Sequence, residues 1–232
     1  MYQIMTDNVL EQLSTPGKPP SEAVRIRRAA ERASYEADVV NEIVDAAIIA
    51  HVGTVRDGKP VVIPMFAVRD GGHLLLHGAP AAGVLRRAKG RDVCVTMTLL
   101  DGLVLARSGF HHSINYRSVV VIGTAEPIED EAEKEQALEL FMETLVPSRQ
   151  ADLRPTTTKE LRGTEVLRVS LAQASAKIRS GPPIDDDGDY QLGMWAGVVP
   201  VTTTFGEAEP DPQLDDSVEL PENVAAIVGR VL

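Results

Sequence analysis

The sequence has little of several residue types, and each shortage excludes a class of protein. One cysteine, Cys94, among 232 residues excludes an intrachain disulfide and a cysteine-cluster zinc site. No run of about 18 uncharged apolar residues occurs, and the start, MYQIMTDNVLEQLS, has neither the basic nor the apolar region of a signal peptide. We therefore expect a cytoplasmic protein that does not bind a membrane.

Common catalytic motifs are also missing. The chain contains no Walker loop, no G-x-G-x-x-G after a strand, no G-x-S-x-G elbow and no H-E-x-x-H helix. Of its 5 histidines, only His111 and His112 are adjacent, and neighbours on a strand point to opposite faces. We expect no metal site.

The charge of the chain is acidic in total and basic in the middle. The 23 basic and 34 acidic residues give a net charge of −11, which disfavours nucleic acid as a partner because counterion release needs a basic face. Residues 51–123 hold 9 basic and 4 acidic groups. A local positive field of this kind can hold a small anionic ligand, although a strand region with few solvating carboxylates would give the same excess.

Hydrophobic periodicity divides the chain into three parts. Residues 1–20 read as a loose N-terminal arm, residues 21–205 as one domain, and residues 206–232 as an acidic C-terminal tail with little apolar content. Within the domain, the patterns predict helices over 21–32, 36–45, 79–88 and 130–145.

The middle of the domain alternates short β-rich runs with turn signals. Residues 47–55, 60–68 and 73–78 are separated by Asp57-Gly58 and Gly71-Gly72, which predicts an antiparallel meander. Further strands are expected over 92–100 and 103–110, on either side of Asp101-Gly102, and over 115–128, with a later strand over 164–171. Six strands in one run predict a mainly β fold with flanking helices, in which the strands form a barrel or a strongly curled sheet.

Two groups of cations are candidate anion sites. Arg86 and Arg87 lie in the predicted helix after Pro80, where amide donors and an arginine fork suit a phosphate; the alternative is a solvated basic face. Lys177 and Arg179 alternate on the last predicted strand, so both leave one face. They either bind a ligand or pair with the acidic run that follows them. Trp195 suits the core, a dimer contact or stacking on a flat ligand.

Three long segments resemble the FMN-binding split-barrel proteins related to pyridoxamine 5'-phosphate oxidase. They are HVGTVRDGKPVVIPMFAVRDGGHLLLHG, VCVTMTLLDGLVLARSGFHHSINYRSVVVIGTAEPIED and SAKIRSGPPIDDDGDYQLGMWAGVVPV. The branch that they resemble most is the nitroimidazole-reductase-like or flavin-nucleotide-binding one. The resemblance extends from about Arg27 to Val201 and implies a six-stranded antiparallel split β-barrel that forms a homodimer and binds FMN between its subunits.

The resemblance also implies where the cofactor lies. Ile63, Pro64 and Met65 would run along the flavin ring, and His77-Gly78-Ala79 would face its phosphate. Together with the cations and the tryptophan, the candidate cofactor-binding residues are Ile63, Pro64, Met65, His77, Gly78, Ala79, Arg86, Arg117, Ser118, Lys177, Arg179 and Trp195. His111 and His112 are the candidate catalytic residues, as proton relays near neutral pH.

One departure from the family keeps several functions open. After His77-Gly78, relatives carry hydroxyls and a cation for the phosphate, whereas this chain reads HGAPAAGVLRR. The first hypothesis is an FMN-dependent oxidoreductase that acts on a small molecule by two-electron transfer. The alternative is a barrel that has lost flavin and uses the groove as a cofactor-free pocket in specialised biosynthesis. A third possibility is haem or flavin sequestration, with His77 or His111 as an axial ligand.

Overall fold

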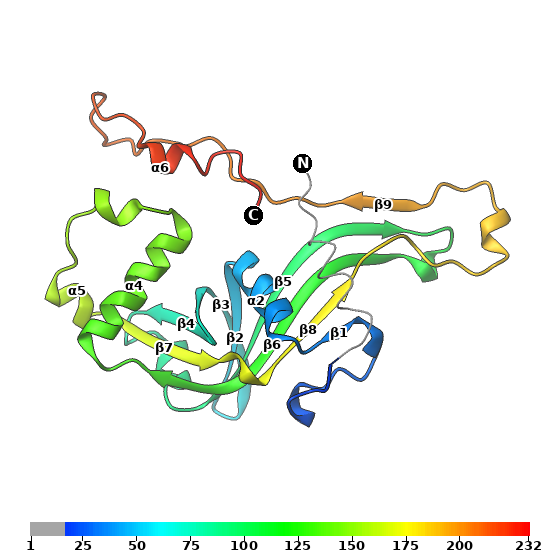
Figure 1. Cartoon of the computed structure of the whole chain (residues 1–232), viewed down its shortest axis with the longest axis horizontal. Helices are drawn as coiled ribbons and strands as arrows, with labels where there is room; N and C mark the ends of the chain where they lie inside the picture. Colours follow the sequence, from blue (N-terminus) through cyan, green and yellow to red (C-terminus); the bar gives the residue numbers. More distant parts are fainter. Residues whose placement is uncertain (1–16) are drawn as a thin grey trace.

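The computed structural model describes residues 17–232, and this part of the chain forms one nine-stranded sheet with helices around it (Figure 1). The strands are β1 (Ala33–Ser34), β2 (Ile49–Arg56), β3 (Lys59–Asp70), β4 (His73–Gly78), β5 (Asp92–Leu105), β6 (Ser113–Pro127), β7 (Glu165–Ser170), β8 (Ala174–Arg179) and β9 (Gly197–Pro200). The α-helices are α2 (Ala37–Ala46), α3 (Gly83–Ala88), α4 (Glu131–Leu145), α5 (Thr158–Arg162) and α6 (Glu222–Ala225).

Six of the strands close into a barrel. The sheet order is β1-β8-β6-β7-β4-β3-β2-β5-β9, and an additional β6–β5 pairing joins the two ends of the six-strand segment from β6 to β5. All these pairings are antiparallel. The predicted mainly β fold with a six-stranded antiparallel split barrel is therefore confirmed.

The meander from β2 to β4 follows from its turns. Asp57 and Gly58 adopt φ values of 51° and 73°, the left-handed pair that a two-residue hairpin needs to match the twist of its strands. Beyond Ala67–Asp70, however, β3 does not pair with β4. The Lys59–Phe66 part of β3 pairs with β2 only, so among the described residues its second edge has no strand partner.

The interior of the barrel is filled from one side by α2. Its buried face (Val39, Val40, Ile43 and Val44) joins the inward residues of the strands in one hydrophobic core. A second, smaller core lies between the outer face of β4 and α4, where Leu75 and Val166 pack with Ala137 and Phe141. The helices predicted over 36–45 and 130–145 are confirmed as α2 and α4.

The prediction of two strands separated by Asp101-Gly102 is wrong. β5 runs through these residues with only a shift of register between Leu100 and Gly102. The bulge is held because the Asp101 carboxylate accepts hydrogen bonds from Arg117 on β6, the shortest at 2.7 Å. A Cβ on Gly102 would lie 3.0 Å from the carbonyl oxygen of Val199, so glycine allows β9 to approach.

Two predicted helices differ from the structure: one is replaced by 3-10 turns and the other begins later than expected. The helix over 21–32 is replaced by two 3-10 turns, η1 (Glu22–Val24) and η2 (Ala30–Arg32), with Ala29 at a φ of 53° before the second. The helix over 79–88 begins only at Gly83, because residues 79–82 form a turn closed by the Ala82 amide and the Ala79 carbonyl. The remaining 3-10 turns are η3 (Gly109–His111), η4 (Arg149–Asp152), η5 (Leu171–Gln173) and η6 (Asp189–Gln191).

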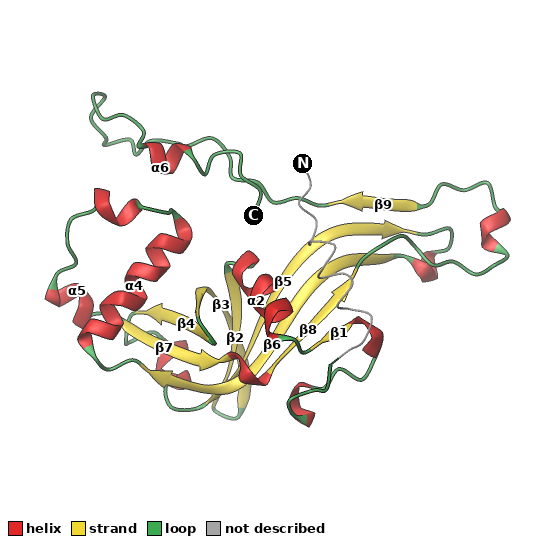
Figure 2. Ribbon diagram, viewed as in Figure 1, coloured by secondary structure: helices red, strands yellow, loops and turns green. Residues whose placement is uncertain are grey.

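The β5–β6 hairpin continues past the barrel as an arm, which we define as residues 98–118 together with the returning chain 180–200. Figure 2 shows the arm extending away from the barrel, with β9 along its outer edge. The chain then returns toward α4, where the Asn223 side chain donates a hydrogen bond of 2.7 Å to Asp152. No helix in the described part is both long and apolar enough to cross a membrane.

Candidate functional site

The residues expected along the flavin ring lie at the open edge of β3. Ile63 and Pro64 are exposed and Met65 is half-buried. Pro64 pairs with His51 on β2, and His51 pairs with Thr96 on β5. Pro64, His51 and Thr96 therefore form one row across the three strands, beside backbone groups of β3 that no described strand pairs with.

Next to this edge, four cations form what we call the basic end of the barrel: Arg56 and Lys59 at the β2–β3 turn, and Arg86 and Arg87 on α3, which packs against β2. None of the four has a carboxylate partner within 4 Å among residues 17–232. Asp57 lies in the same turn, so the four cations leave a net positive charge there, which suits an anionic ligand.

Arg87 is the most fixed of these cations. Its Nε donates to Oγ1 of Thr54 at 3.2 Å, and Thr54 is buried in β2. A Cβ on Gly83 would lie 2.7 Å from Nη1 of Arg87, so the guanidinium folds back across a glycine at the start of α3. Arg86, the residue singled out from the sequence, is exposed and has no such contact.

The structure gives His77 a different place from the one expected. Its ring packs against Phe141 of α4 at a centroid distance of 4.3 Å and against Phe66 at 6.4 Å. Burial lowers the pKa of His77 and so favours the neutral ring, and the ring packs beside the second core. Gly78 pairs with Glu165 of β7, and Ala79 is exposed.

A second group of predicted residues lies on β6 and β8. Arg117 is neutralised by Asp101, and the Ser118 hydroxyl donates to the Lys177 carbonyl at 3.2 Å. Nζ of Lys177 donates to the Arg28 carbonyl at 2.9 Å. These side chains are held by the protein itself and do not reach the basic end through any hydrogen bond.

Arg179, also on β8, has only neutral partners. It is 7% exposed and donates to Asn115 Oδ1 and to the carbonyls of Gly181 and Pro182. Burial lowers its pKa, and the nearby charge of Arg32 acts in the same direction. The acidic run does not pair with Lys177 or Arg179, since Asp185 binds Arg107 and Asp186 faces His111.

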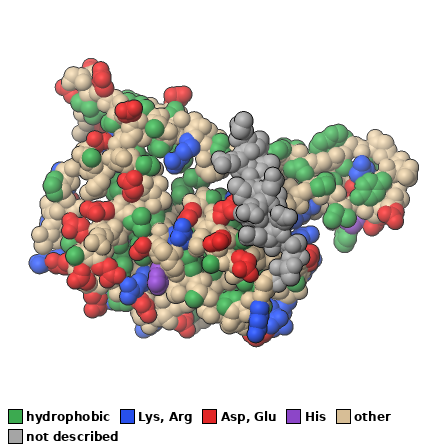
Figure 3. Space-filling model, in the orientation of Figure 1, with side chains coloured by type: hydrophobic (Ala, Val, Ile, Leu, Met, Phe, Trp, Pro, Cys, Tyr) green, Lys and Arg blue, Asp and Glu red, His purple; other side chains and the backbone are tan. Residues whose placement is uncertain are grey.

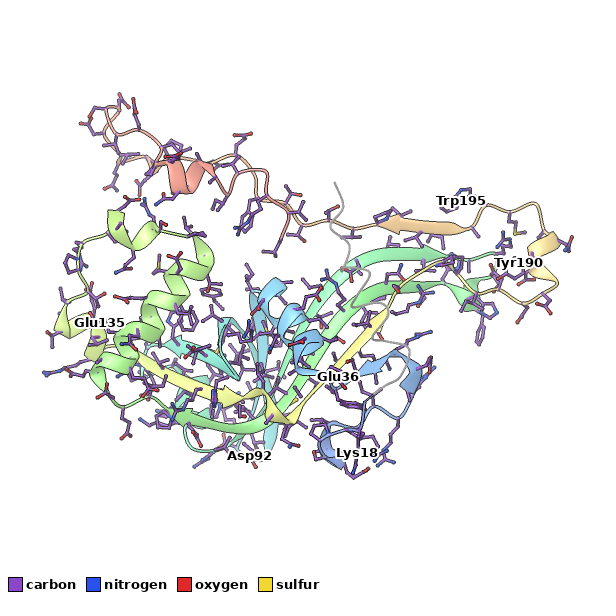
Figure 4. All side chains as sticks on the ribbon, viewed as in Figure 1. Lys18, Glu36, Asp92, Glu135, Tyr190 and Trp195 are labelled. Atoms are coloured by element: carbon purple, nitrogen blue, oxygen red, sulfur yellow. The ribbon has the colours of Figure 1, made fainter. Side chains whose placement is uncertain are left out.

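The third group lies on the arm. His111 Nε2 is 3.4 Å from Asp186, and His112 Nδ1 is 2.8 Å from the Ser108 carbonyl oxygen. Figure 4 shows Trp195 on the arm, above β9 and away from the body of the barrel, and its side chain is 69% exposed. Among the described residues, no side-chain hydrogen bond joins the predicted residues of β3, β4 and α3 to those of β6, β8 and the arm.

A cavity of about 690 Å³ lies elsewhere, between α2, the β3–β4 turn and the β7–β8 connection. It is lined by two cations, Lys18 and Arg69, and Arg69 is paired with Asp45, with Nε 2.7 Å from Oδ1. None of the predicted site residues lines this cavity, and we assign it no role in the site.

The closed six-stranded barrel with an open β3 edge defines the chain as a split-barrel protein. Residues 36–178 match the family model described as pyridoxamine 5'-phosphate oxidase. The chain therefore belongs to the pyridoxamine 5'-phosphate oxidase family, as its sequence indicates.

Solved structures give more specific similarities. The flavocytochrome Anf3 from Azotobacter vinelandii is 39% identical, with 92% of this chain and 100% of that chain covered and a TM-score of 0.87. The FAD and haem binding protein from Mycobacterium smegmatis is 36% identical over 85% of this chain and 98% of that chain, with a TM-score of 0.82. A candidate 5-nitroimidazole antibiotic resistance protein from Bacteroides thetaiotaomicron is 26% identical, with 63% of this chain and 86% of that chain covered and a TM-score of 0.53. Among curated proteins, none matches the chain.

Proposed function

We propose that the chain is a flavin- and haem-binding redox protein, similar in activity to a flavocytochrome. The observation that carries the proposal is the similarity to the flavocytochrome Anf3 over nearly the whole of both chains. The second relative, which binds FAD and haem, supports the same pair of cofactors. Cys94 is free and exposed, in keeping with a reducing cytoplasm.

Within this proposal, FAD fits the described residues better than FMN. FMN ends in a phosphate dianion, which needs several donors around one phosphorus atom, and residues 79–83, Ala-Pro-Ala-Ala-Gly, supply no side-chain donor. The diphosphate of FAD has no terminal dianion, and the basic end supplies cations beside this loop. From the sequence alone, the missing hydroxyls favoured a loss of flavin. In this proposal they indicate FAD in place of FMN.

The residues of the chain have defined tasks in this function. A bound flavin supplies two-electron transfer and a bound haem supplies one-electron transfer. Arg87 binds a phosphate group, and the free edge of β3 between Val61 and Phe66 orients the ring system. The apolar side chains of Ile49 and Val62 are exposed in a single chain. Once another protein surface packs over them, they keep water away from the ring. A small molecule would be the electron donor or acceptor.

We infer that a second copy of the chain covers these surfaces. Apolar side chains are exposed both beside the β3 edge and on the arm, including Leu103, Ile114 and Val199, and exposed apolar surface of this extent is typical of an interface. Light scattering should give twice the chain mass of 25.0 kDa at micromolar concentration. A mass of one chain in the presence of both cofactors would contradict the homodimer.

The cofactors can be tested on freshly purified protein. We expect flavin absorbance near ~450 nm together with a Soret band, and mass spectrometry of the released cofactor should detect FAD. Protein that carries no flavin and takes up neither FAD nor FMN would contradict the proposal. That result would instead favour the alternative, a barrel that has lost flavin and uses its groove as a cofactor-free pocket.

A further inference from the structure

A histidine that ligates haem iron must be neutral, with one ring nitrogen free for the iron. In ligating histidines the other nitrogen donates its proton to a carbonyl or a carboxylate, which fixes the ring and its tautomer. The described part of the chain contains five histidines: His51, His73, His77, His111 and His112. The two requirements, a free ring nitrogen that iron can reach and a hydrogen bond that fixes the other nitrogen, distinguish among these five histidines.

Two histidines each lack one of these requirements. His77 lies beside the second core against Phe66 and Phe141, so α4 would have to move before iron could reach it. Nε2 of His111 is 3.4 Å from the Asp186 carboxylate, whose side chain is 83% exposed, and no hydrogen bond among the described residues fixes the His111 ring. The two residues named from the sequence as axial ligands are therefore poorly suited to that role.

His112 meets both requirements. It is exposed, and its Nδ1 lies 2.8 Å from the Ser108 carbonyl oxygen. A carbonyl oxygen only accepts, so Nδ1 must carry the proton in this hydrogen bond. The lone pair of the neutral ring is then on Nε2, which has no hydrogen-bond partner among the described residues. His51 and His73 are exposed as well, but no described group holds either ring.

The turn that carries His112 is fixed by a buried ion pair. The amide and the Nη1 of Arg107 each donate to Asp185 at 2.9 Å, and the Asp185 side chain is fully buried. The Arg107 guanidinium also lies over the Tyr190 ring at 4.9 Å. The Ser108 carbonyl, one residue further on, therefore presents His112 from a rigid base, as a metal ligand requires.

The same part of the arm carries apolar surface for a flat macrocycle. Phe110 is 91% exposed, two residues before His112. Ile114, Leu103 and Val199 lie opposite one another across β6, β5 and β9 and are all exposed. Figure 3 shows hydrophobic side chains gathered on the arm.

We propose that Nε2 of His112 is an axial ligand to the iron of a haem that lies against the apolar surface of the arm. The assignment rests on the proposed haem function and adds the residue and the place. It differs from the ligands expected from the sequence, because only the folded arm shows which imidazole has a held Nδ1 and an open Nε2.

The test is a haemin titration of the full-length protein and of His112→Ala, followed by the Soret band. Wild-type protein should show the shifted band of ligated haem, whereas the variant should bind haemin about tenfold or more weakly, with a band close to that of free haemin. His73→Ala, which removes an exposed imidazole outside the proposed flavin and haem surfaces, is the matched control and should keep the wild-type spectrum. Imidazole added to His112→Gly should restore the ligated band.

Flavin content measured on the same samples checks folding, since the β3 edge is separate from the arm. If wild-type protein binds haemin and His112→Ala gives the same affinity and spectrum, the ligand assignment is overturned while the proposed function stands. If wild-type protein shows no ligated band at any haemin concentration, the haem function fails, and the assignment of His112 fails with it.

Discussion

An Arg87→Ala variant is expected to bind flavin about 10- to 100-fold more weakly than the wild-type protein, because a hydrogen bond to a charged group contributes about 1.5–3 kcal/mol. Arg87 is the one cation of the basic end that a buried side chain, Thr54, holds in place. The Arg87 side chain has therefore already lost conformational entropy in the free protein, and phosphate binding does not have to order it. The affinity is measured by quenching of flavin fluorescence during titration of the apoprotein.

Arg86→Ala is the matched control for this variant. It removes the same charge from the same helix, but the Arg86 side chain is exposed and makes no hydrogen bond to the described residues, so the loss should be about fivefold or less. Gly83→Ala should cause a smaller loss than Arg87→Ala, since its Cβ would meet Nη1 of Arg87 at 2.7 Å and displace the flexible guanidinium without removing its charge. Equal losses for Arg86→Ala and Arg87→Ala would show that charge alone, and not the held guanidinium, binds the phosphate.

Much of the barrel could be predicted because its signals are local. The Asp57-Gly58 turn forces left-handed backbone angles at two successive residues, which only a tight hairpin accommodates. The spacing of four apolar residues predicts the buried face of α2: Val39, Val40, Ile43 and Val44. Both features depend on residues within ten positions of one another, so tertiary contacts do not change them.

Asp101-Gly102 shows where a local signal fails. The pair has the composition of a hairpin turn, but the partners that decide its conformation are distant: Arg117 on β6 holds Asp101, and Val199 of β9 packs over Gly102. The strand therefore continues through a bulge. As a result the arm is a long hairpin that carries the apolar surface beyond the barrel, rather than one more strand of the barrel wall.

The sequence indicates the region of the candidate site more readily than its single residues. The resemblance points to Ile63, Pro64 and Met65, and the structure gives these residues a strand edge that no described strand pairs with; their contact with a flavin stays a prediction. Arg87 could not be preferred to Arg86 from the sequence, because the choice depends on which side of a six-residue helix faces Thr54. Arg117 and Lys177 looked available for a ligand, yet Asp101 and the Arg28 carbonyl occupy them.

Asp185→Ala should lower the thermal midpoint of unfolding by roughly 6 to 20 °C, as expected when one partner of a buried ion pair is removed from a domain of this size. The Asp185 side chain is fully buried, and its loss leaves the Arg107 amide and guanidinium without an acceptor. The midpoint is measured by circular dichroism near neutral pH. Asp186→Ala is the control, because that carboxylate is exposed and faces only His111; its midpoint should change by less than about 2 °C.

The effect of Asp185 also has a defined pH dependence. Burial acts to raise the pKa of its carboxyl group, but the amide and guanidinium of Arg107 and the Ser108 amide outweigh burial and hold the pKa below its ordinary value. A lowered pKa in the folded state stabilises the protein fully above the unfolded value of about 3.9, and this contribution disappears as the pH falls through the folded pKa. The difference in midpoint between wild type and Asp185→Ala should therefore stay constant from neutral pH down to about pH 5 and shrink below about pH 4. A difference that is absent at neutral pH, or that grows in acid, would show that the Arg107–Asp185 pair does not hold the arm. The rigid base that we assign to His112 would then be lost as well.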